Sequence, residues 1–280
     1  KKIKEAVELG KKAGVWKIKI VPPMSEIIGG KVSFKNLKDV EVEDLLGRER
    51  VDLDTKQIEN FIKNKSVLVT GAAGSIGSEL SRQVAKFRPG VLLLLDQDET
   101  GIFNISKELA ENFPDMKISR FVADITDKEK INKIFGKLKP KIIFHAAAYK
   151  HVPLMEENID EAIKNNIFGT KNLIEAAVDS GAEEFVLIST DKAVNPSSVM
   201  GVTKRICEML CRLYNKKEKT RFISVRFGNV LNSRGSVVPI FREQIKRGGP
   251  VEITHPEMKR YFMLTSEACL LVLQSGAMGK

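Results

Sequence analysis

66-SVLVTGAAGSIGSEL-80 joins an apolar run to three glycines and then to a helical pattern. The run Val67–Thr70 has no helical period, as expected of a buried parallel strand. Gly71 gives the following turn an unrestricted backbone, and Gly74 lets a pyrophosphate approach because no Cβ intervenes. Gly77 lets the new helix pack closely on the sheet. The stretch therefore predicts a strand, a phosphate-binding turn and a helix.

The start of this helix supplies groups that bind phosphate. Around Ser75 and Ile76 the first helical turn would offer free N–H groups and the positive end of the helix dipole. A glycine triplet also fits an ordinary strand–turn–helix. Here, however, the spacing is GxxGxxG, and the next apolar run, Val91–Leu95, ends at Asp96. Asp96 lies 25 residues after Gly71, about where the acid that contacts a ribose hydroxyl is expected in dinucleotide-binding proteins. We therefore predict a dinucleotide site.

Asp96 also bears on which dinucleotide binds. Its carboxylate would repel the 2′-phosphate of NADP, and no arginine in 96-DQDE-99 offsets that repulsion. The sequence therefore predicts NAD rather than NADP.

Composition is typical of a soluble globular protein. Of the 280 residues, 42% are hydrophobic and 29% are charged. No apolar run approaches the roughly 18 residues of a membrane span, and we recognise no signal peptide. The net charge of +10 comes largely from lysines spread beside acids, as in 127-DKEKINKIFGKLKPK-141, and only 6% of residues are aromatic. We therefore predict solvated helix faces and no nucleic-acid partner.

Three cysteines are too few for a disulfide framework. Cys207 and Cys211 have a spacing that could suit a metal on a helix, but no histidine lies nearby to complete a site. We predict buried thiols, no metal, and a reducing, cytoplasmic compartment.

A regular alternation of strands and helices begins at Ser66. We expect strands near 66–70, 91–95, 118–122, 141–145, 185–189 and 221–226. Helical patterns lie between them at 76–87, 100–112, 127–138, 160–180 and 198–214. This rhythm predicts an α/β fold, a doubly wound Rossmann-type parallel sheet with helices on both faces.

The flanking stretches are less regular. Residues 1–47 predict an incomplete connector, the tail of an upstream Rossmann-like domain, and residues 48–64 a charged linker. Residues 65–227 form the predicted dinucleotide-binding domain. For residues 228–280 we predict a partial substrate-binding lobe that is short at its C-terminal end. It would contain a helix near 236–247, a strand at 251–254 and a last helix from Ser266.

In such sheets chemistry takes place at the carboxyl ends of the strands. After the third strand, Asp124 and Ile125 are candidates for contact with the adenine side of the cofactor. After the fourth strand comes a run of small residues that would let the chain pass close under a cofactor: Ala146, Ala147 and Ala148.

Three further residues adjoin this run. His145 is as consistent with a hydrogen-bonded structural histidine as with a functional one. Lys150 and His151 fall past the strand end, where they would face the cleft.

The fifth strand ends in Thr190, Asp191 and Lys192. A hydroxyl, a carboxylate and an amine in consecutive positions could move protons on a sugar-like substrate while a nicotinamide moves hydride. The same residues also fit an exposed turn before Pro196, and the residues alone leave both interpretations open.

The chain closely resembles the nucleotide-sugar 4,6-dehydratases of bacterial capsule, O-antigen and protein-glycosylation pathways, within the extended short-chain dehydrogenase/reductases. The resemblance rests on TGAAGSIGSEL at 70–80, LLLLDQDE at 92–99, HAAAYKHVPLME at 145–156, STDKAVNP at 189–196, VMGVTKR at 199–205, VRFGNVLNSRGSVVP at 225–239 and HPEMKRYFML at 255–264. It covers nearly the whole chain and implies NAD-dependent conversion of a UDP-sugar, with UDP-N-acetylglucosamine expected, to a 4-keto-6-deoxy sugar.

One position departs from the superfamily pattern Tyr-x-x-x-Lys. The spacing is kept as Met200-x-x-x-Lys204, and a methionine cannot accept a proton. A methionine at this position is known in the large, membrane-linked branch of the family. The resemblance therefore transfers the acid–base work to Thr190, Asp191 and Lys192.

The resemblance also assigns roles. Lys192 would remove the C5 proton, Asp191 would protonate the departing C6 hydroxyl, and Thr190 would bind near O4. Lys204 would hold the nicotinamide ribose, and Asp191 or a water held by Thr190 would accept the C4 hydroxyl proton.

Further family positions concern binding. Asn166, in 165-NNIFGT-170, resembles the asparagine that supports the catalytic lysine through a water. Asn229, Arg234 and Arg260 lie in substrate-side motifs, and arginine forks suit a pyrophosphate.

The resemblance has consequences beyond the site. The first 47 residues resemble a cytosolic connector, which implies a membrane-anchored parent protein on the cytoplasmic face of the inner membrane. Helices 160–180 and 198–214 lie where the superfamily usually dimerises, so we expect a homo-oligomer. Two alternatives stay open: a nucleotide-sugar 4-epimerase, and a non-catalytic NAD-binding module.

Overall fold

The computed structural model describes residues 2–15, 18–20, 38–39, 54–231, 233, 235–253 and 255–279. The chain divides into two compact units, Lys1–Val51 and Asp52–Lys280. The first unit contains α1 (Lys2–Lys12) and the antiparallel pair β1 (Lys19–Ile20) and β2 (Lys38–Asp39). Most of the predicted connector and linker up to residue 53 lies outside the described residues.

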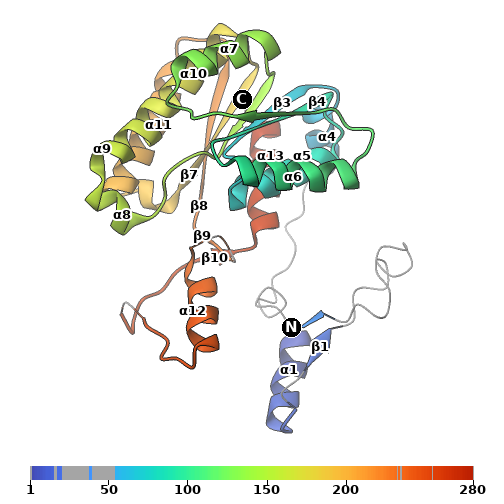
Figure 1. Cartoon of the computed structure of the whole chain (residues 1–280), viewed down its shortest axis with the longest axis vertical. Helices are drawn as coiled ribbons and strands as arrows, with labels where there is room; N and C mark the ends of the chain where they lie inside the picture. Colours follow the sequence, from blue (N-terminus) through green and yellow to red (C-terminus); the bar gives the residue numbers. More distant parts are fainter. Residues whose placement is uncertain are drawn as a thin grey trace. The chain divides into compact units, whose positions relative to one another are not determined.

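The second unit is built around a six-stranded parallel sheet (Figure 1). Its strands are β3 (Ser66–Thr70), β4 (Val91–Asp96), β5 (Ile118–Val122), β6 (Ile142–His145), β7 (Glu184–Thr190) and β8 (Arg221–Phe227). The spatial order is β5-β4-β3-β6-β7-β8, so the direction of winding reverses between β3 and β6. This confirms the predicted Rossmann-type sheet, and such a reversal opens a crevice at the carboxyl ends of the strands.

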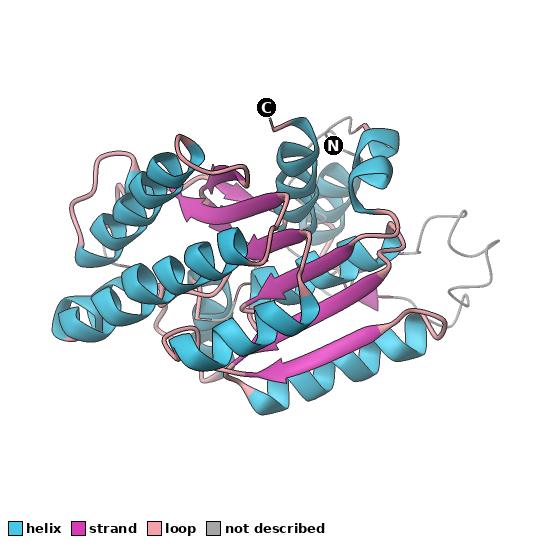
Figure 2. Cartoon of the chain, turned by 90° about the horizontal axis from the view of Figure 1, so that it is seen from above, coloured by secondary structure: helices cyan, strands magenta, loops and turns pink. Residues whose placement is uncertain are grey.

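Helices cover both faces of this sheet (Figure 2). One face carries α4 (Thr55–Ile62), α5 (Ser75–Lys86), α6 (Glu99–Asn112) and α13 (Thr265–Met278). The other carries α7 (Lys128–Leu138), α10 (Thr170–Asp179) and α11 (Val199–Asn215). In β3, Val67 and Val69 join the first apolar core while Leu68 joins the second. Burial on both faces explains why the strands are continuous apolar runs.

The predicted helix at 160–180 has a more complex form. It comprises α9 (Ile159–Ala162), a π-helix over Ile163–Gly169, and α10. A short helix, α8 (Val152–Glu157), precedes it. Single π-helical turns inside α-helices are frequent at functional sites.

After β8 the chain forms a small lobe and then returns to the sheet. The lobe holds β9 (Asn229–Val230), α12 (Val237–Lys246) and β10 (Phe262–Met263), with β9 and β10 paired in parallel. The strand predicted at 251–254 is wrong for 251–253, which are irregular; the pairing segments are β9 and β10 instead. α13 then packs beside α5, where Cys269, Val272 and Leu273 join the first core.

Candidate active site

A cavity of about 240 Å³ opens at the carboxyl ends of β3, β4, β5 and β6. The predicted cofactor residues that line it are Gly71, Gly74, Asp96, Asp124, Ile125, Ala146, Ala147 and Ala148. It is also lined by residues that the sequence analysis did not select, among them Ala73, Gln97, Asp98, Tyr149 and Asn165. Gln97 and Asp98 directly follow Asp96, so the rule that sites form at strand ends could have found them.

The glycine turn is close-packed. Gly71 has a φ of 67°, and a Cβ there would lie 2.5 Å from the backbone nitrogen of Ala147. A Cβ on Gly77 would lie 2.0 Å from the carbonyl oxygen of Gly71. Gly74 is the residue before α5, and no side-chain hydrogen bond from this position caps the first turn, which contains Ser75 and Ile76. These contacts agree with the turn predicted at Gly71 and the close packing predicted at Gly77, and the pyrophosphate contact of Gly74 stays a prediction.

Asp96 fastens the glycine turn to β4. Its Oδ2 accepts a hydrogen bond from the backbone N–H of Ala73 at 2.9 Å, and its Oδ1 accepts one from Asp98 at 3.0 Å. The neighbouring acid, Asp124, accepts a hydrogen bond from the N–H of Thr126 at 2.8 Å and is exposed. The carboxylate of Asp96 thus shapes the cavity, a role that the sequence analysis did not assign.

His145 is a structural residue. It is fully buried, and its Nδ1 and Nε2 lie 2.7 Å and 2.8 Å from the hydroxyl oxygens of Thr70 and Thr170. Burial lowers the pKa of His145 well below its usual value. The neutral ring therefore joins β3, β6 and α10 beneath the cavity.

Asn166, within the π-helix, clamps the loop after β6. Its Oδ1 accepts a hydrogen bond from the N–H of Tyr149 at 2.8 Å, and its Nδ2 donates to the carbonyl of Tyr149 at 3.0 Å. Nδ2 also donates to the hydroxyl of Thr203 on α11 at 3.0 Å. The Cys207 thiol donates to the Asn166 carbonyl at 3.0 Å, and all three cysteines are buried and free, as predicted.

Lys204 and Met200 occupy adjacent turns of α11. Lys204 is 6% exposed. Burial lowers the pKa of Lys204 below its usual value. Met200 is buried in a small apolar cluster with Met155 and Ala162. Met200 therefore contributes packing, and Lys204 places a charged group one turn further along α11.

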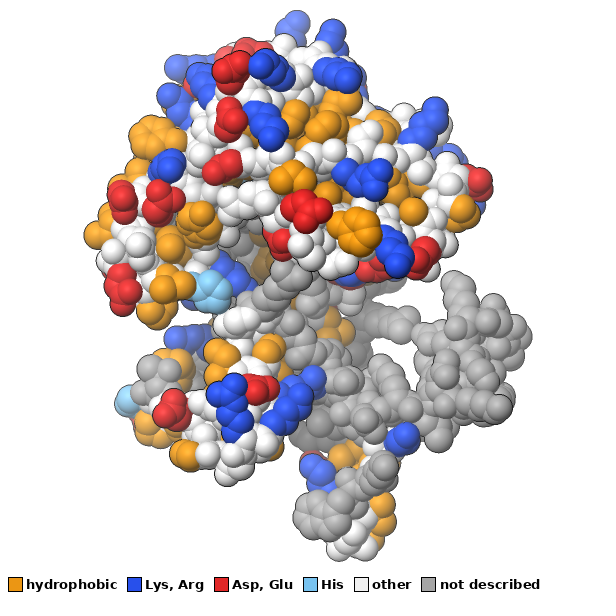
Figure 3. Space-filling view, in the orientation of Figure 1, with side chains coloured by type: hydrophobic (Ala, Val, Ile, Leu, Met, Phe, Trp, Pro, Cys, Tyr) orange, Lys and Arg blue, Asp and Glu red, His pale blue; other side chains and the backbone are white. Residues whose placement is uncertain are grey.

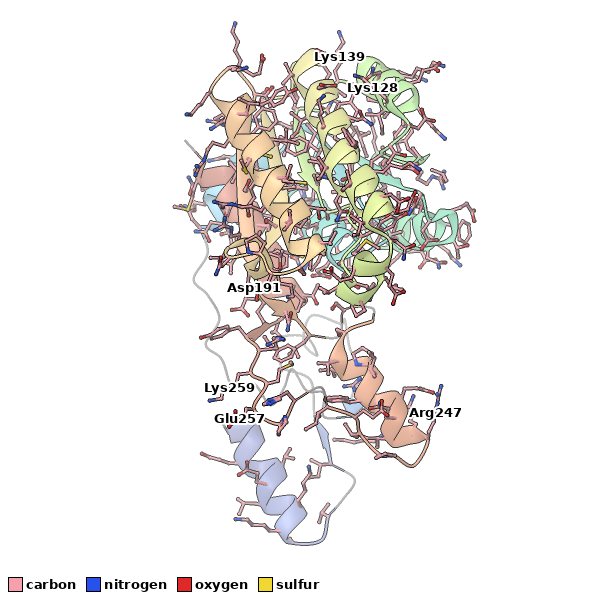
Figure 4. All side chains as sticks on the ribbon, turned by 90° about the vertical axis from the view of Figure 1, so that its left-hand side faces the viewer. Lys128, Lys139, Asp191, Arg247, Glu257 and Lys259 are labelled. Atoms are coloured by element: carbon pink, nitrogen blue, oxygen red, sulfur yellow. The ribbon has the colours of Figure 1, made fainter. Side chains whose placement is uncertain are left out.

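Thr190, Asp191 and Lys192 form one hydrogen-bonded group at the end of β7. The Thr190 hydroxyl donates to Asp191 Oδ1 at 2.9 Å, and Lys192 Nζ donates to the same oxygen at 3.2 Å. Burial would raise the pKa of Asp191, but the hydrogen bond from Thr190 and the charge of Lys192 outweigh it and lower the pKa. Figure 4 shows Asp191 at the end of the sheet opposite Lys128 and Lys139.

The small lobe reaches this group through β9. Lys192 Nζ also donates to Asn229 Oδ1 at 3.3 Å, a contact between residues 37 positions apart in the chain. Lys150 and His151 are exposed after β6, and a Cβ on Gly235 would lie 2.5 Å from His151 Cε1. Arg260 is exposed and its Nη1 donates to the carbonyl of Lys259 at 2.9 Å, whereas Arg234 lies outside the described residues.

Charges of both signs lie on the surface of the sheet region. On the face shown in Figure 3, basic side chains of the sheet region are interspersed with acidic ones. Among the described residues, no group of three or more His, Cys, Asp or Glu side chains could hold a metal ion. Within the described ranges, no helix is both long and apolar enough to cross a membrane.

The parallel sheet, the glycine turn and the Met200-x-x-x-Lys204 helix define an extended short-chain dehydrogenase/reductase. The sequence profile of a family described as "Polysaccharide biosynthesis protein" matches residues 67–280. The chain belongs to this family.

Three curated relatives illustrate its range. The capsular polysaccharide biosynthesis protein CapD of Staphylococcus aureus is 52% identical over 262 residues, which cover 93% of this chain and 44% of CapD. A UDP-N-acetylglucosamine 4,6-dehydratase (inverting) of Campylobacter jejuni is 34% identical over 220 residues, covering 77% of this chain and 64% of that enzyme. A UDP-glucose 4-epimerase of Rickettsia bellii is 34% identical over 217 residues, covering 75% and 62%. The chain thus spans less than half the length of CapD.

A solved structure shares the fold of this chain. The X-ray structure of Pen from Bacillus thuringiensis matches with a TM-score of 0.74 and 34% identity, covering 79% of this chain and 68% of Pen. This match confirms the fold of the sheet region.

Proposed function

We propose that this chain carries the catalytic domain of an NAD-dependent nucleotide-sugar 4,6-dehydratase that acts on a UDP-sugar, UDP-N-acetylglucosamine, in polysaccharide biosynthesis. The observation that carries the proposal is the hydrogen-bonded group Thr190–Asp191–Lys192 at the end of β7. The group joins a hydroxyl, a carboxylate and an amine, which are the functions that oxidation and dehydration of a sugar require. The similarity to the Campylobacter jejuni dehydratase supports the same assignment.

The residues that line the cavity suit the pyrophosphate and adenosine part of a nicotinamide dinucleotide. The uncapped N-terminus of α5 at Gly74 would bind the pyrophosphate. Asp96 would bind the adenosine ribose, since each of its oxygens accepts one N–H and has a second lone pair free. Lys204 would bind the nicotinamide ribose from α11. When bound, the nicotinamide supplies a site for reversible hydride transfer.

The proton transfers fall to Asp191 and Lys192. Asp191, whose lowered pKa keeps it ionised near neutral pH, would accept the proton of the C4 hydroxyl as that carbon is oxidised. The resulting 4-keto group acidifies C5. Lys192, once its ammonium has released a proton to solvent, would take the C5 proton as a neutral amine. Asp191 would then pass its proton to the C6 hydroxyl, which leaves as water, and Lys192 would return a proton to C5. The proton balance closes within these two residues.

The direct test is a mass spectrum of the chain after incubation with NAD and UDP-N-acetylglucosamine. The proposal expects loss of one water from the sugar nucleotide, and no such loss with Asp191→Asn. An unchanged sugar nucleotide, with NAD bound by the same sample, would contradict it.

A 4-epimerase is the second candidate, favoured by the similarity to the Rickettsia bellii protein. It would need the cofactor site but no acid for C6. An epimerase would yield a product of unchanged mass that separates from the substrate by chromatography, so the same experiment distinguishes the two activities.

We also propose that the chain forms a homo-oligomer. Several large apolar side chains on the π-helix and on α11 are exposed, including Phe168 (55%), Met209 (60%) and Leu213 (46%). Exposed apolar patches of this kind mark interaction sites. Light scattering with size-exclusion chromatography should give a dimer or larger, and Phe168→Asp should shift it toward the monomer. A wild-type monomer at high concentration would contradict the proposal.

A further inference from the structure

Glu208, on α11 one turn after Lys204, is a buried carboxylate to which the proposed chemistry gives no role. It is 8% exposed. Its Oε1 accepts hydrogen bonds from the Ser189 hydroxyl at 2.5 Å and from Arg226 Nε at 2.7 Å. Its Oε2 accepts from Arg226 Nη2 and from Arg205 Nη1, the latter at 3.2 Å. All four donors converge on one carboxylate.

These partners come from the segments that carry the candidate catalytic groups. Ser189 lies on β7 directly before Thr190, and Asp191 and Lys192 follow in the short 3-10 turn after the strand. Arg226 lies opposite Ser189 on β8, three residues before Asn229, which accepts from Lys192. Glu208 itself shares α11 with Lys204. A single carboxylate thus links the end of β7, the end of β8 and the helix of the buried lysine.

The charge of Glu208 is held in place by its partners. Burial would raise the pKa of Glu208, but the hydrogen bonds from Arg226 and Ser189 outweigh it and lower the pKa. Hydrogen bonds between charged groups are among the stronger ones in proteins. The carboxylate is buried while the side chains of Arg226 and Arg205 stay 37% and 42% exposed, so the arginines hold Glu208 from the surface side. The carboxylate is therefore suited to hold Ser189 and Arg226 in fixed positions rather than to donate a proton.

We propose that Glu208 is a positioning residue that, through Ser189 and Arg226, fixes the Thr190–Lys192 segment relative to Lys204 and Asn229. The catalytic meaning of this arrangement rests on the proposed dehydratase function. The proposal explains why a glutamate is buried on a helix face that otherwise packs against the sheet.

The chain contains a matched control at the other end of the same two strands. Glu184 on β7 pairs with Arg221 on β8 in register, and Arg221 Nε donates to Glu184 Oε2 at 2.7 Å. Glu184 is also buried, with 0% exposure. Because this pair lies at the amino end of the strands, it tests the loss of a buried glutamate charge that faces a partly exposed arginine, away from the site.

The experiment compares Glu208→Gln with Glu184→Gln in the whole chain. For Glu208→Gln we expect amide hydrogen exchange in residues 189–193 to rise about tenfold, since a charged hydrogen-bond network is weakened locally. We expect kcat on UDP-N-acetylglucosamine to fall about 100-fold, as for a misplacement of roughly 1 Å, with KM and NAD affinity changed less than about threefold. Glu184→Gln should leave the 189–193 exchange and kcat unchanged.

Ser189→Ala is a milder variant that keeps the argument testable if Glu208→Gln does not fold. Ser189→Ala removes one hydrogen bond and leaves no charge unpaired. The rise in exchange at 189–193 and the fall in kcat should therefore both be present but smaller than with Glu208→Gln. Unchanged exchange at 189–193 in Glu208→Gln and Ser189→Ala, or an equal fall in kcat with Glu184→Gln, would overturn the proposal. If the wild-type chain releases no water from the sugar nucleotide, the dehydratase function fails, and the exchange data still decide whether Glu208 positions the segment.

Discussion

The proposed cofactor cavity at the ends of β3–β6 and the proposed catalytic edge, formed by the end of β7 with α11 and β9, are built differently. The cavity is bounded by backbone and small side chains, with Gly71, Gly74 and three alanines in its lining. The catalytic edge is held by charged and polar side chains, in which Asp191, Lys192 and Asn229 form one chain of hydrogen bonds.

This difference predicts different vulnerabilities. In the cavity, an added methyl group meets backbone atoms, so the first consequence is steric and affects folding and cofactor binding. At the catalytic edge, a removed charge leaves its partners unpaired while the fold persists, so the first consequence is chemical. Variants in the cavity should therefore change stability and cofactor binding, whereas variants at the catalytic edge should change turnover.

Asp191→Asn should have the largest effect. The amide cannot carry a proton between C4 and C6, and we expect kcat to fall about 10²–10⁴-fold with NAD affinity unchanged. Steady-state kinetics and NAD titration measure the two quantities. The exposed Asp115→Asn is the control and should keep normal turnover. Near-normal turnover with Asp191→Asn would end the assignment of this residue.

Gly77→Ala should affect the cavity through sterics. The new Cβ would lie 2.0 Å from the Gly71 carbonyl oxygen, which cannot move without shifting the glycine turn. We expect a loss of about 1–3 kcal/mol in the free energy of unfolding and weaker NAD binding.

Gly136→Ala on α7 is the matched control for Gly77→Ala. Nothing lies within 4 Å of its Cβ position, so this variant should be stabilised by up to about 1 kcal/mol. Chemical denaturation measures both variants, and equal stability of the two would refute the steric account.

Asn229→Ala probes the link between the catalytic edge and the small lobe. It removes the 3.3 Å hydrogen bond from Lys192, and the loss of one such bond corresponds to a fall in kcat of about 3–10-fold. Stability should hardly change, because the contact is only partly buried. A fall as large as that of Asp191→Asn would mean that Asn229 contacts the reacting sugar.

The sequence predicted the cavity better than the catalytic edge, for a physical reason. The glycine turn is a local motif, so Gly71, Gly74 and Gly77 could be given roles from spacing alone. The contacts of Asp96 with Ala73, of Lys192 with Asn229 and of Glu208 with Ser189 join separate elements. Such contacts depend on the register of strands and helices, which no local pattern specifies.

Glu208 and α13 show two ways in which local patterns mislead. A glutamate on an amphipathic helix is typical of a solvated face, yet Glu208 is buried by its partners. The last helix follows the small lobe in sequence, and its return to α5 follows only from the apolar face formed by Cys269, Val272 and Leu273.

The smallest expected effect is the pH dependence of stability. It differs between the cavity and the catalytic edge because each contains a different buried titratable group. His145, beneath the cavity, has a folded pKa well below its ordinary 6.5. As pH falls below about 6.5, the unfolded chain binds a proton that the folded chain does not, so stability falls by up to about 1.4 kcal/mol per pH unit. Glu208, at the catalytic edge, has a lowered pKa, so its contribution is present above 4.5 and is lost only as pH falls through its folded pKa. Urea unfolding between pH 7.5 and about 5 should therefore show a slope that His145→Gln flattens and that the exposed His255→Gln leaves unchanged. If stability depends on pH to the same extent in His145→Gln, the dependence arises from a group other than His145.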